Sequence, residues 1–299
     1  MVIVSREILE NLVNGVSEAE DNEKLPFDFK DFIENVDHES KVNPYLAKRN
    51  IKYVGTGSSR TAYMIPKGSC VDAKTVPVCF KVAKNLAGIK QNETEHKIIT
   101  RYGKDEPCFT KLYKYDSTRN LCLESEIGAP LQNYDIKKYF ADWNSFVEKE
   151  SKSAGFIDSL KKVVSKLLKK NITDPGKDLK INETKNIFDI LYLVKDFRNI
   201  GDSDAKYKDA AKKYIEIMLE CGKKNPKYLG LSSLIHVLFD KGAEKELRIG
   251  EFSGAENFAM VYRGGKEPVL IPIDYGVTEK VFDDFYGMKK KSTYFSDLK

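Results

Sequence analysis

The chain has 299 residues, of which 41% are hydrophobic and 32% are charged, a composition typical of a water-soluble globular protein with room for one or two domains. No apolar run approaches the roughly 18 residues that a membrane span needs. The first residues have no basic region and carry a charge at Arg6, which makes a poor signal peptide, and we expect a cytoplasmic protein. The five cysteines are scattered without a CxxC or Cys/His cluster, which argues against a disulfide framework or a zinc site.

The net charge of +5 is unevenly distributed along the sequence. The first 50 residues hold six Lys/Arg and eleven Asp/Glu, so the rest of the chain carries +10. This positive excess is spread over a long stretch instead of being concentrated in one patch. It therefore predicts a solvated, lysine-rich surface, and we expect neither nucleic acid nor a membrane as a partner.

Residues 1–50 predict two short helices joined by an acidic link. Residues 5–15 and 27–36 carry apolar side chains at helical spacing, and residues 17–26 between them are polar and largely acidic. Both helical segments are short. We therefore expect residues 1–50 to form a helical, acidic appendage outside the core.

From residue 51 onward the apolar spacing changes to that of β-strands. The sequence predicts antiparallel strands at 51–55, 61–66 and 76–83, a helix at 88–103, and further strands at 110–116 and 121–127. Helical segments follow at 133–150, 156–170, 183–197, 206–222 and 229–242, separated by links that contain Pro or Gly. A loop at 248–257 and a strand pair at 258–262 and 269–274 come last. The expected fold class is α+β.

The stretch "VGTGSSRTAYMI" at 54–65 places unusually much bare backbone and hydroxyl between two predicted strands. Gly55, Gly57, Ser58 and Ser59 are ordinary turn residues, so a loose surface hairpin is one interpretation. The other is a flap over phosphates, where backbone N–H groups bind and larger side chains would obstruct. The stretch alone leaves both interpretations open.

The order of these parts resembles the protein-kinase-like fold. "VCFK" at 78–81 stands where that family carries its phosphate-binding lysine, here Lys81, and Glu95 or Glu93 in the following helix would pair with it. "LESEI" at 123–127, which contains Glu124 and Glu126, stands at the position of the hinge whose backbone binds adenine.

Two later motifs extend the resemblance. Asn257 stands in the catalytic-loop position, and "IDYG" at 273–276 stands for the Asp-Phe-Gly element, with Asp274 as its acid. More narrowly, the glycine-rich stretch and "KVAKNLAGIKQNETE" at 81–95 resemble kinase-like proteins of bacteriophages, including phage serine/threonine kinases. The resemblance covers residues 51–127 and 248–276.

The resemblance implies a bilobal protein with residues 51–130 as an antiparallel β N-lobe and hinge, and residues 131–299 as a shortened, mainly helical C-lobe. It implies ATP and Mg²⁺ as ligands, with the glycine-rich stretch and Lys81 on the phosphates and with Asn257 and Asp274 as hard oxygen ligands of the metal. The implied activity is transfer of the γ-phosphoryl group to Ser or Thr of a host or phage protein.

The sequence departs from the kinase pattern at the catalytic base. Active protein kinases have an Asp five residues before the catalytic-loop Asn, and Phe252 stands there. Glu251, in a shifted register, and Glu256 are the nearest carboxylates. Arg60 also stands where a third Gly is usual, and 25 residues follow Asp274. A pseudokinase that binds nucleotide or only a partner, and a small-molecule phosphotransferase, therefore stay open as alternatives, and the oligomeric state is not indicated.

Overall fold

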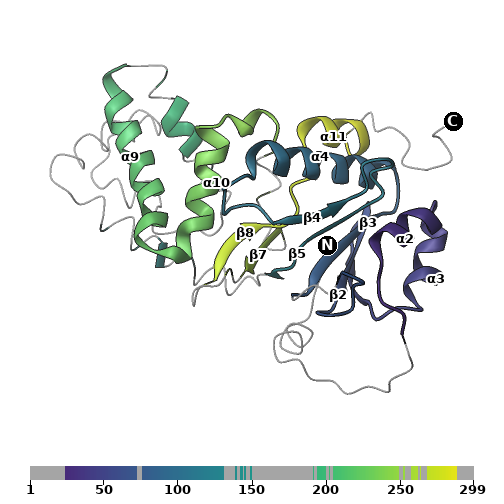
Figure 1. Cartoon of the computed structure of the whole chain (residues 1–299). Helices are drawn as coiled ribbons and strands as arrows, with labels where there is room; N and C mark the ends of the chain where they lie inside the picture. Colours follow the sequence, from purple (N-terminus) through teal and green to yellow (C-terminus); the bar gives the residue numbers. More distant parts are fainter. Residues whose placement is uncertain are drawn as a thin grey trace. The chain divides into compact units, whose positions relative to one another are not determined.

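The protein is a mixed α+β structure with a five-stranded antiparallel sheet and several helices (Figure 1). The computed structural model describes residues 24–72, 76–130, 205–248, 257–261 and 268–287, with separate positions at 139, 142, 143, 145, 149, 191, 194–199, 202, 252 and 263. The chain divides into two compact units. The first comprises Met1–Lys104, Thr110–Pro130 and Tyr275–Lys299, and the second comprises Asp105–Phe109 and Leu131–Asp274.

The first unit is built on the five-stranded sheet, and all five strands predicted between residues 51 and 127 are confirmed. Each hydrogen-bonded neighbour runs antiparallel, in the spatial order β1-β2-β3-β5-β4. The strands are β1 (Lys52–Thr56), β2 (Arg60–Ile65), β3 (Val78–Ala83), β4 (Leu112–Tyr115) and β5 (Cys122–Glu126). The unit also contains the two-residue strand β6 (Ala129–Pro130).

The central strand β3 is covered on both faces, which explains its nearly continuous apolar sequence. Its side chains alternate between the two faces. The Phe80 ring lies 4.9 Å from the rings of both Phe27 and Phe32, in the aromatic core between the sheet and the N-terminal helices. Lys81, the next residue, projects to the opposite face. The sequence alternation of β3 thus separates a hydrophobic core from a polar site.

The expectation of an appendage is wrong for the described part of residues 1–50. Two short helices, α2 (Phe29–Asn35) and α3 (Val42–Leu46), are joined by the 3-10 turn η1 (Glu39–Lys41), and their apolar side chains belong to the same core cluster as β3. Asp28 caps α2 by accepting from the Lys30 N–H at 2.8 Å. These residues looked peripheral because each segment is short. Their aromatic side chains find partners only far along the sequence, which local spacing does not reveal. The predicted helix at 5–15 lies outside the described residues.

Helix α4 (Leu86–Tyr102) packs on the other face of the sheet and confirms the predicted helix. Asn85 caps it by accepting from the Gly88 N–H at 3.1 Å. Its buried residues include the polar Gln91, Asn92 and Glu95, which is unusual for a helix packed on a sheet. A second helix of this unit, α11 (Glu279–Phe285), packs against α4 through Ala87, Val281 and Phe285 (Figure 1).

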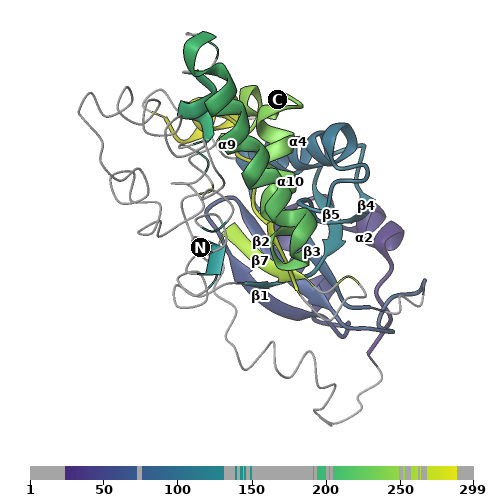
Figure 2. The ribbon, with the colours of Figure 1, turned by 90° about the vertical axis from the view of Figure 1, so that its left-hand side faces the viewer.

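The second unit contains α9 (Ala205–Lys224) and α10 (Leu229–Phe239), which lie side by side (Figure 2). The 3-10 turns η3 (Pro226–Tyr228) and η4 (Ala243–Lys245) flank α10. The hairpin of β7 (Phe258–Val261) and β8 (Val269–Pro272) packs on α10 so closely that a Cβ on Gly230 would lie 1.7 Å from the Leu270 carbonyl oxygen. Both helices and both strands were predicted. The predicted helix at 156–170 and most of those at 133–150 and 183–197 lie outside the described residues.

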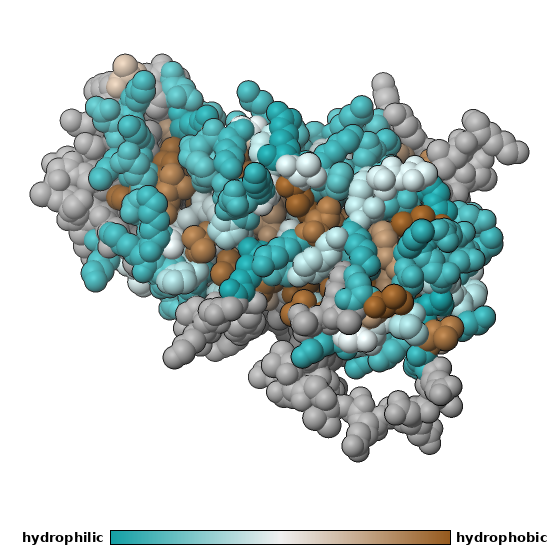
Figure 3. Space-filling model, viewed as in Figure 1, coloured by the Kyte–Doolittle hydropathy of each residue, from teal (hydrophilic) through white to brown (hydrophobic). Residues whose placement is uncertain are grey.

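The surface is hydrophilic over most of the face shown in Figure 3, with hydrophobic residues in small separate patches. Within the described part of the chain, no helix is both long and apolar enough to cross a membrane.

Candidate functional site

The predicted lysine and one of its two candidate carboxylates form a buried ion pair in the first unit. The Lys81 Nζ lies 2.7 Å from Oε1 of Glu95, and the two side chains are 10% and 0% exposed. Glu93, the alternative partner, instead contacts Lys90 and Lys97 on the outer side of α4. The structure therefore selects Glu95. The helical period explains this outcome, because positions 93 and 95 face directions about 200° apart.

A second cation shares the same carboxylate. Arg60, the first residue of β2, donates from one guanidinium nitrogen to Oε2 of Glu95 at 2.7 Å. The same nitrogen donates to Oδ1 of Asn92 at 3.3 Å, and Asn92 lies one helical turn before Glu95. Sequence reasoning placed Arg60 in the loop and did not find Asn92. An Asn three residues before a Glu, and therefore on the same helix face, was the signal available in the sequence.

The two cations keep Glu95 ionised. Burial is the largest single influence on this carboxyl and raises its pKa, but the positive charges of Lys81 and Arg60 and their hydrogen bonds outweigh it. The pKa of Glu95 is therefore below its ordinary value. At neutral pH the group is a carboxylate that can hold the Lys81 ammonium in one place.

The glycine-rich loop between β1 and β2 is held by its backbone carbonyls. The Lys84 N–H donates to the Ser59 oxygen at 2.8 Å, the Lys84 Nζ to the Gly57 oxygen at 3.1 Å, and the Asn85 side chain to the Ser58 oxygen at 3.1 Å. Ser59 is buried and Ser58 is exposed. Gly55 lies at the register shift between β1 and β2. The loop is thus tied to the turn that begins α4.

Close packing at the start of α4 requires glycine. A Cβ on Gly88 would lie 2.1 Å from the Ser59 carbonyl oxygen. At the other end of the chain, a Cβ on Gly276 would lie 2.7 Å from the Gln91 carbonyl oxygen, and the buried Tyr275 hydroxyl lies 3.0 Å from the Thr110 hydroxyl. The "YG" of the "IDYG" motif is therefore part of the packing around α4.

Glu124 and Glu126, placed by the sequence in a hinge, lie within β5. Glu124 is fully buried, with its Oε1 4.0 Å from the Lys114 Nζ. The Glu126 N–H donates to the Lys111 oxygen at 2.8 Å, and its carboxylate accepts from the Lys111 N–H at 3.2 Å. These backbone and side-chain groups are engaged in the sheet.

The two predicted metal ligands lie together at one end of the β7–β8 hairpin in the second unit. Phe258 is paired with Pro272, and the Ile273 N–H donates to the Asn257 oxygen at 2.8 Å, directly before Asp274. Amide and carboxylate oxygens suit Mg²⁺, whose remaining ligands are usually phosphate and water. Among the described residues, no group of three or more His, Cys, Asp or Glu side chains gathers as a metal site by itself.

The position of the expected catalytic base is occupied by a buried aromatic side chain. Phe252 is 1% exposed, and its ring lies 5.9 Å from that of Phe258. Glu251 and Glu256, the other candidates, lie outside the described residues. At position 252 the side chain therefore supports packing and offers no proton acceptor.

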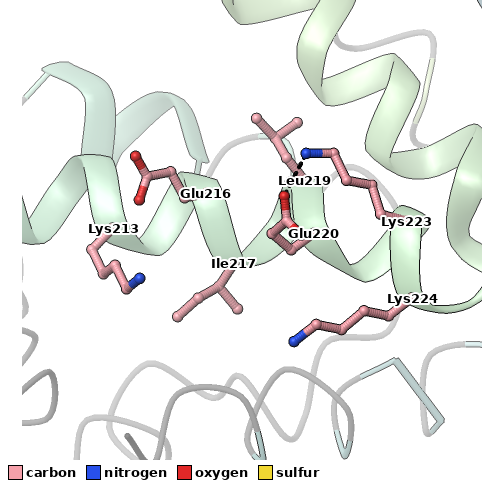
Figure 4. Close-up of a pocket in the computed structure, with 7 residues that line it drawn as sticks. All are labelled: Lys213, Glu216, Ile217, Leu219, Glu220, Lys223 and Lys224. Carbon is pink, nitrogen blue, oxygen red and sulfur yellow. Dashed lines mark hydrogen bonds and ion pairs between the residues drawn. The ribbon is translucent and has the colours of Figure 1, made fainter. Parts of the chain in front are cut away.

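A pocket of about 500 Å³ that the sequence did not predict lies along α9 in the second unit (Figure 4). Its described lining is mainly charged, and Lys223 is ion-paired with Glu220 at 2.5 Å. The lining residues are Lys213, Glu216, Ile217, Leu219, Glu220, Lys223 and Lys224. All of them come from one helix.

The comparisons with known proteins add no assignment. No model of a protein family matches the sequence, and no curated protein matches it.

Proposed function

We propose that this chain is an ATP- and Mg²⁺-dependent kinase-like protein that transfers the γ-phosphoryl group to Ser or Thr of a protein. The observation that carries the proposal is the buried Lys81–Glu95 pair, with the lysine on a central strand and the carboxylate on the helix that follows it. Phosphoryl transfer depends mainly on positioning and electrostatics, and a carboxylate that fixes an ammonium supplies both. The five-stranded sheet, its strand order and the helix after β3 support a kinase-like fold.

The predicted lysine, its partner, the glycine-rich loop and the two metal ligands each have a role in this proposal. Lys81, oriented by Glu95, would bind the phosphates of ATP, and the glycine-rich loop would bring backbone N–H groups to them. Asn257 and Asp274 would hold Mg²⁺, which neutralises phosphate charge when bound. Their position at one end of the hairpin, with Asn257 hydrogen-bonded to the residue before Asp274, supports this role, because both carry hard oxygen ligands.

A second function is favoured by Phe252. A buried phenylalanine at the position of the base would leave ATP binding intact while removing the group that accepts the hydroxyl proton. The chain would then act as a nucleotide-binding partner of another protein. The two functions share the site and differ only in phosphoryl transfer.

Two measurements on the full chain separate these functions. Thermal unfolding with and without MgATP reports binding, and transfer of radiolabelled phosphate from ATP to the chain or to a protein mixture reports catalysis. We expect MgATP to raise the Tm, and Lys81→Met and Asp274→Asn each to abolish the rise. Stabilisation without transfer would support the second function. If MgATP does not change the Tm of the unmodified chain, the proposal is wrong.

A further inference from the structure

Glu95 contacts two cations that come from adjacent strands. Lys81 on β3 is paired with Ala62 on β2, and Arg60 lies two residues before Ala62. Because strand side chains alternate, Arg60 and Lys81 project from the same face of the sheet. Each takes one oxygen of the carboxylate, Oε1 for Lys81 and Oε2 for Arg60, at 2.7 Å in both cases.

Arg60 is itself held in a fixed orientation by Asn92, which is 0% exposed. The Asn92 amide nitrogen donates to the Asn120 oxygen at 2.9 Å and to the Leu121 oxygen at 3.0 Å. With its amide nitrogen committed to these two carbonyls, Asn92 presents Oδ1 to Arg60. The guanidinium is thus placed between two acceptors on α4, and its planar geometry suits such a pair of contacts.

Arg60 also connects α4 to the glycine-rich loop, because it directly follows that loop in the chain. The loop carbonyls of Gly57, Ser58 and Ser59 are bound by Lys84 and Asn85 at the start of α4. The guanidinium adds an attachment two turns further along the same helix. The loop, the strand and the helix are therefore fixed to one another at two places.

We infer that Arg60 is a positioning residue, which fixes the second oxygen of Glu95 and thereby holds α4 and Lys81 in the arrangement of the candidate site. An effect of Arg60 on ATP binding rests on the proposed function, but the positioning of Glu95 and α4 by Arg60 is a property of the protein without nucleotide. Without Arg60, Oε2 of a buried carboxylate loses a charged donor, and α4 loses an attachment to β2. The Lys81–Glu95 contact is then free to rearrange.

The test compares Arg60→Met and Arg60→Lys with Arg49→Met as a matched control. Arg49 is also largely buried and ion-paired, at 2.9 Å from Asp31, but its guanidinium donates to Asp31 and to the Tyr45 oxygen in the N-terminal helices. Two readouts are taken without nucleotide: amide hydrogen exchange of residues 86–102, and the rate at which a water-soluble acylating reagent modifies Lys81, measured by mass spectrometry. MgATP affinity is measured separately.

We expect Arg60→Met to increase both hydrogen exchange in α4 and acylation of Lys81 by about tenfold, as loss of a charged hydrogen bond worth roughly 1.5 kcal/mol or more would give. Arg60→Lys should give a smaller increase in hydrogen exchange and in acylation, and Arg49→Met should change neither. If Arg60→Met does not fold, Arg60→Lys decides, because the shorter lysine side chain replaces the planar guanidinium with a compact ammonium, and exchange in α4 should still exceed that of the control. Exchange and acylation equal to those of Arg49→Met would overturn the inference.

The proposed function fails separately. If the unmodified chain does not bind MgATP, the proposed function is wrong, but the results measured without nucleotide still test the role of Arg60.

Discussion

The ammonium of Lys81 and the carboxylate of Glu95 meet at 2.7 Å in the interior of the first unit, with the carboxylate fully buried. Such a pair is costly to bury, and removing one partner strands the other charge away from water. Specific positioning is what the pair gains in return, since Lys81 on the central strand is held against Glu95 on the helix. That constraint suits a binding site better than it serves stability.

We predict that Glu95→Gln weakens MgATP binding by about tenfold or more, which corresponds to roughly 1.4 kcal/mol. The neutral amide no longer holds the Lys81 ammonium by charge. Glu93→Gln is the matched control, because Glu93 lies on the same helix but contacts only surface lysines, Lys90 and Lys97, among the described residues. Isothermal titration calorimetry checks both variants. Equal affinities for the two would show that the buried pair does not position the ligand.

Acid stability should report the same carboxylate. The pKa of Glu95 in the folded protein is below its ordinary value of 4.5, so its ionised form stabilises the fold at pH values above that number. This contribution is lost as the pH falls below 4.5 and through the lowered pKa. We expect the difference in the free energy of unfolding between the unmodified chain and Glu95→Gln to shrink over that range. Urea unfolding at a series of pH values between 3 and 7 measures it, and a constant difference would contradict the assignment.

Gly88→Ala should destabilise the protein, although alanine in a helix interior normally stabilises it by about 1 kcal/mol relative to glycine. The new Cβ would lie 2.1 Å from the Ser59 carbonyl oxygen and 3.0 Å from the Ala83 Cα, and both neighbours are backbone atoms that cannot move independently. We expect a loss of about 1–3 kcal/mol, as for other overpacked sites. Thermal unfolding decides by sign alone, since a higher Tm would show that the loop and α4 are not in close contact.

The strands between residues 51 and 127 and the helices and strands between 206 and 274 followed from the spacing of their apolar residues, whereas α3, β6 and α11 were not predicted. The lysine and its partner helix followed from motif spacing. Two features did not. Arg60 reads as a loop residue, and its inward direction depends on its register with Ala83 on β3. The aromatic residues at 27, 29 and 32 lie in a short acidic segment, and their partner Phe80 is about fifty residues away. Such long-range pairings leave no local pattern.

The N-terminal helices should therefore contribute directly to stability. We predict that Phe32→Ala lowers the free energy of unfolding by about 3–5 kcal/mol, because Phe32 is 0% exposed and its ring lies 4.9 Å from that of Phe80. Tyr53→Ala serves as the control, since Tyr53 is 57% exposed on the edge strand β1 and should cost about 1 kcal/mol or less. Chemical denaturation of both variants tests this. Similar losses of stability for the two variants would contradict this and would show that residues 24–50 are peripheral to the core.

Placing an acid at position 252 should fail to create a catalytic base. Phe252 is 1% exposed and packs against Phe258, so Phe252→Asp removes a buried ring and adds a carboxylate in an apolar surrounding. We expect a loss of at least about 3–5 kcal/mol in the free energy of unfolding, with no gain in phosphate transfer. Phe252→Leu keeps the site apolar and should cost roughly 1–2 kcal/mol, which separates loss of volume from burial of charge.

Urea unfolding and radiolabel transfer are measured on the same preparations. A Phe252→Asp protein that is as stable as Phe252→Leu and transfers phosphate faster than the unmodified chain would show that position 252 lies within reach of the reacting groups. An acid at position 252 would then restore the catalytic base, and the Phe252 ring would not be essential to the core.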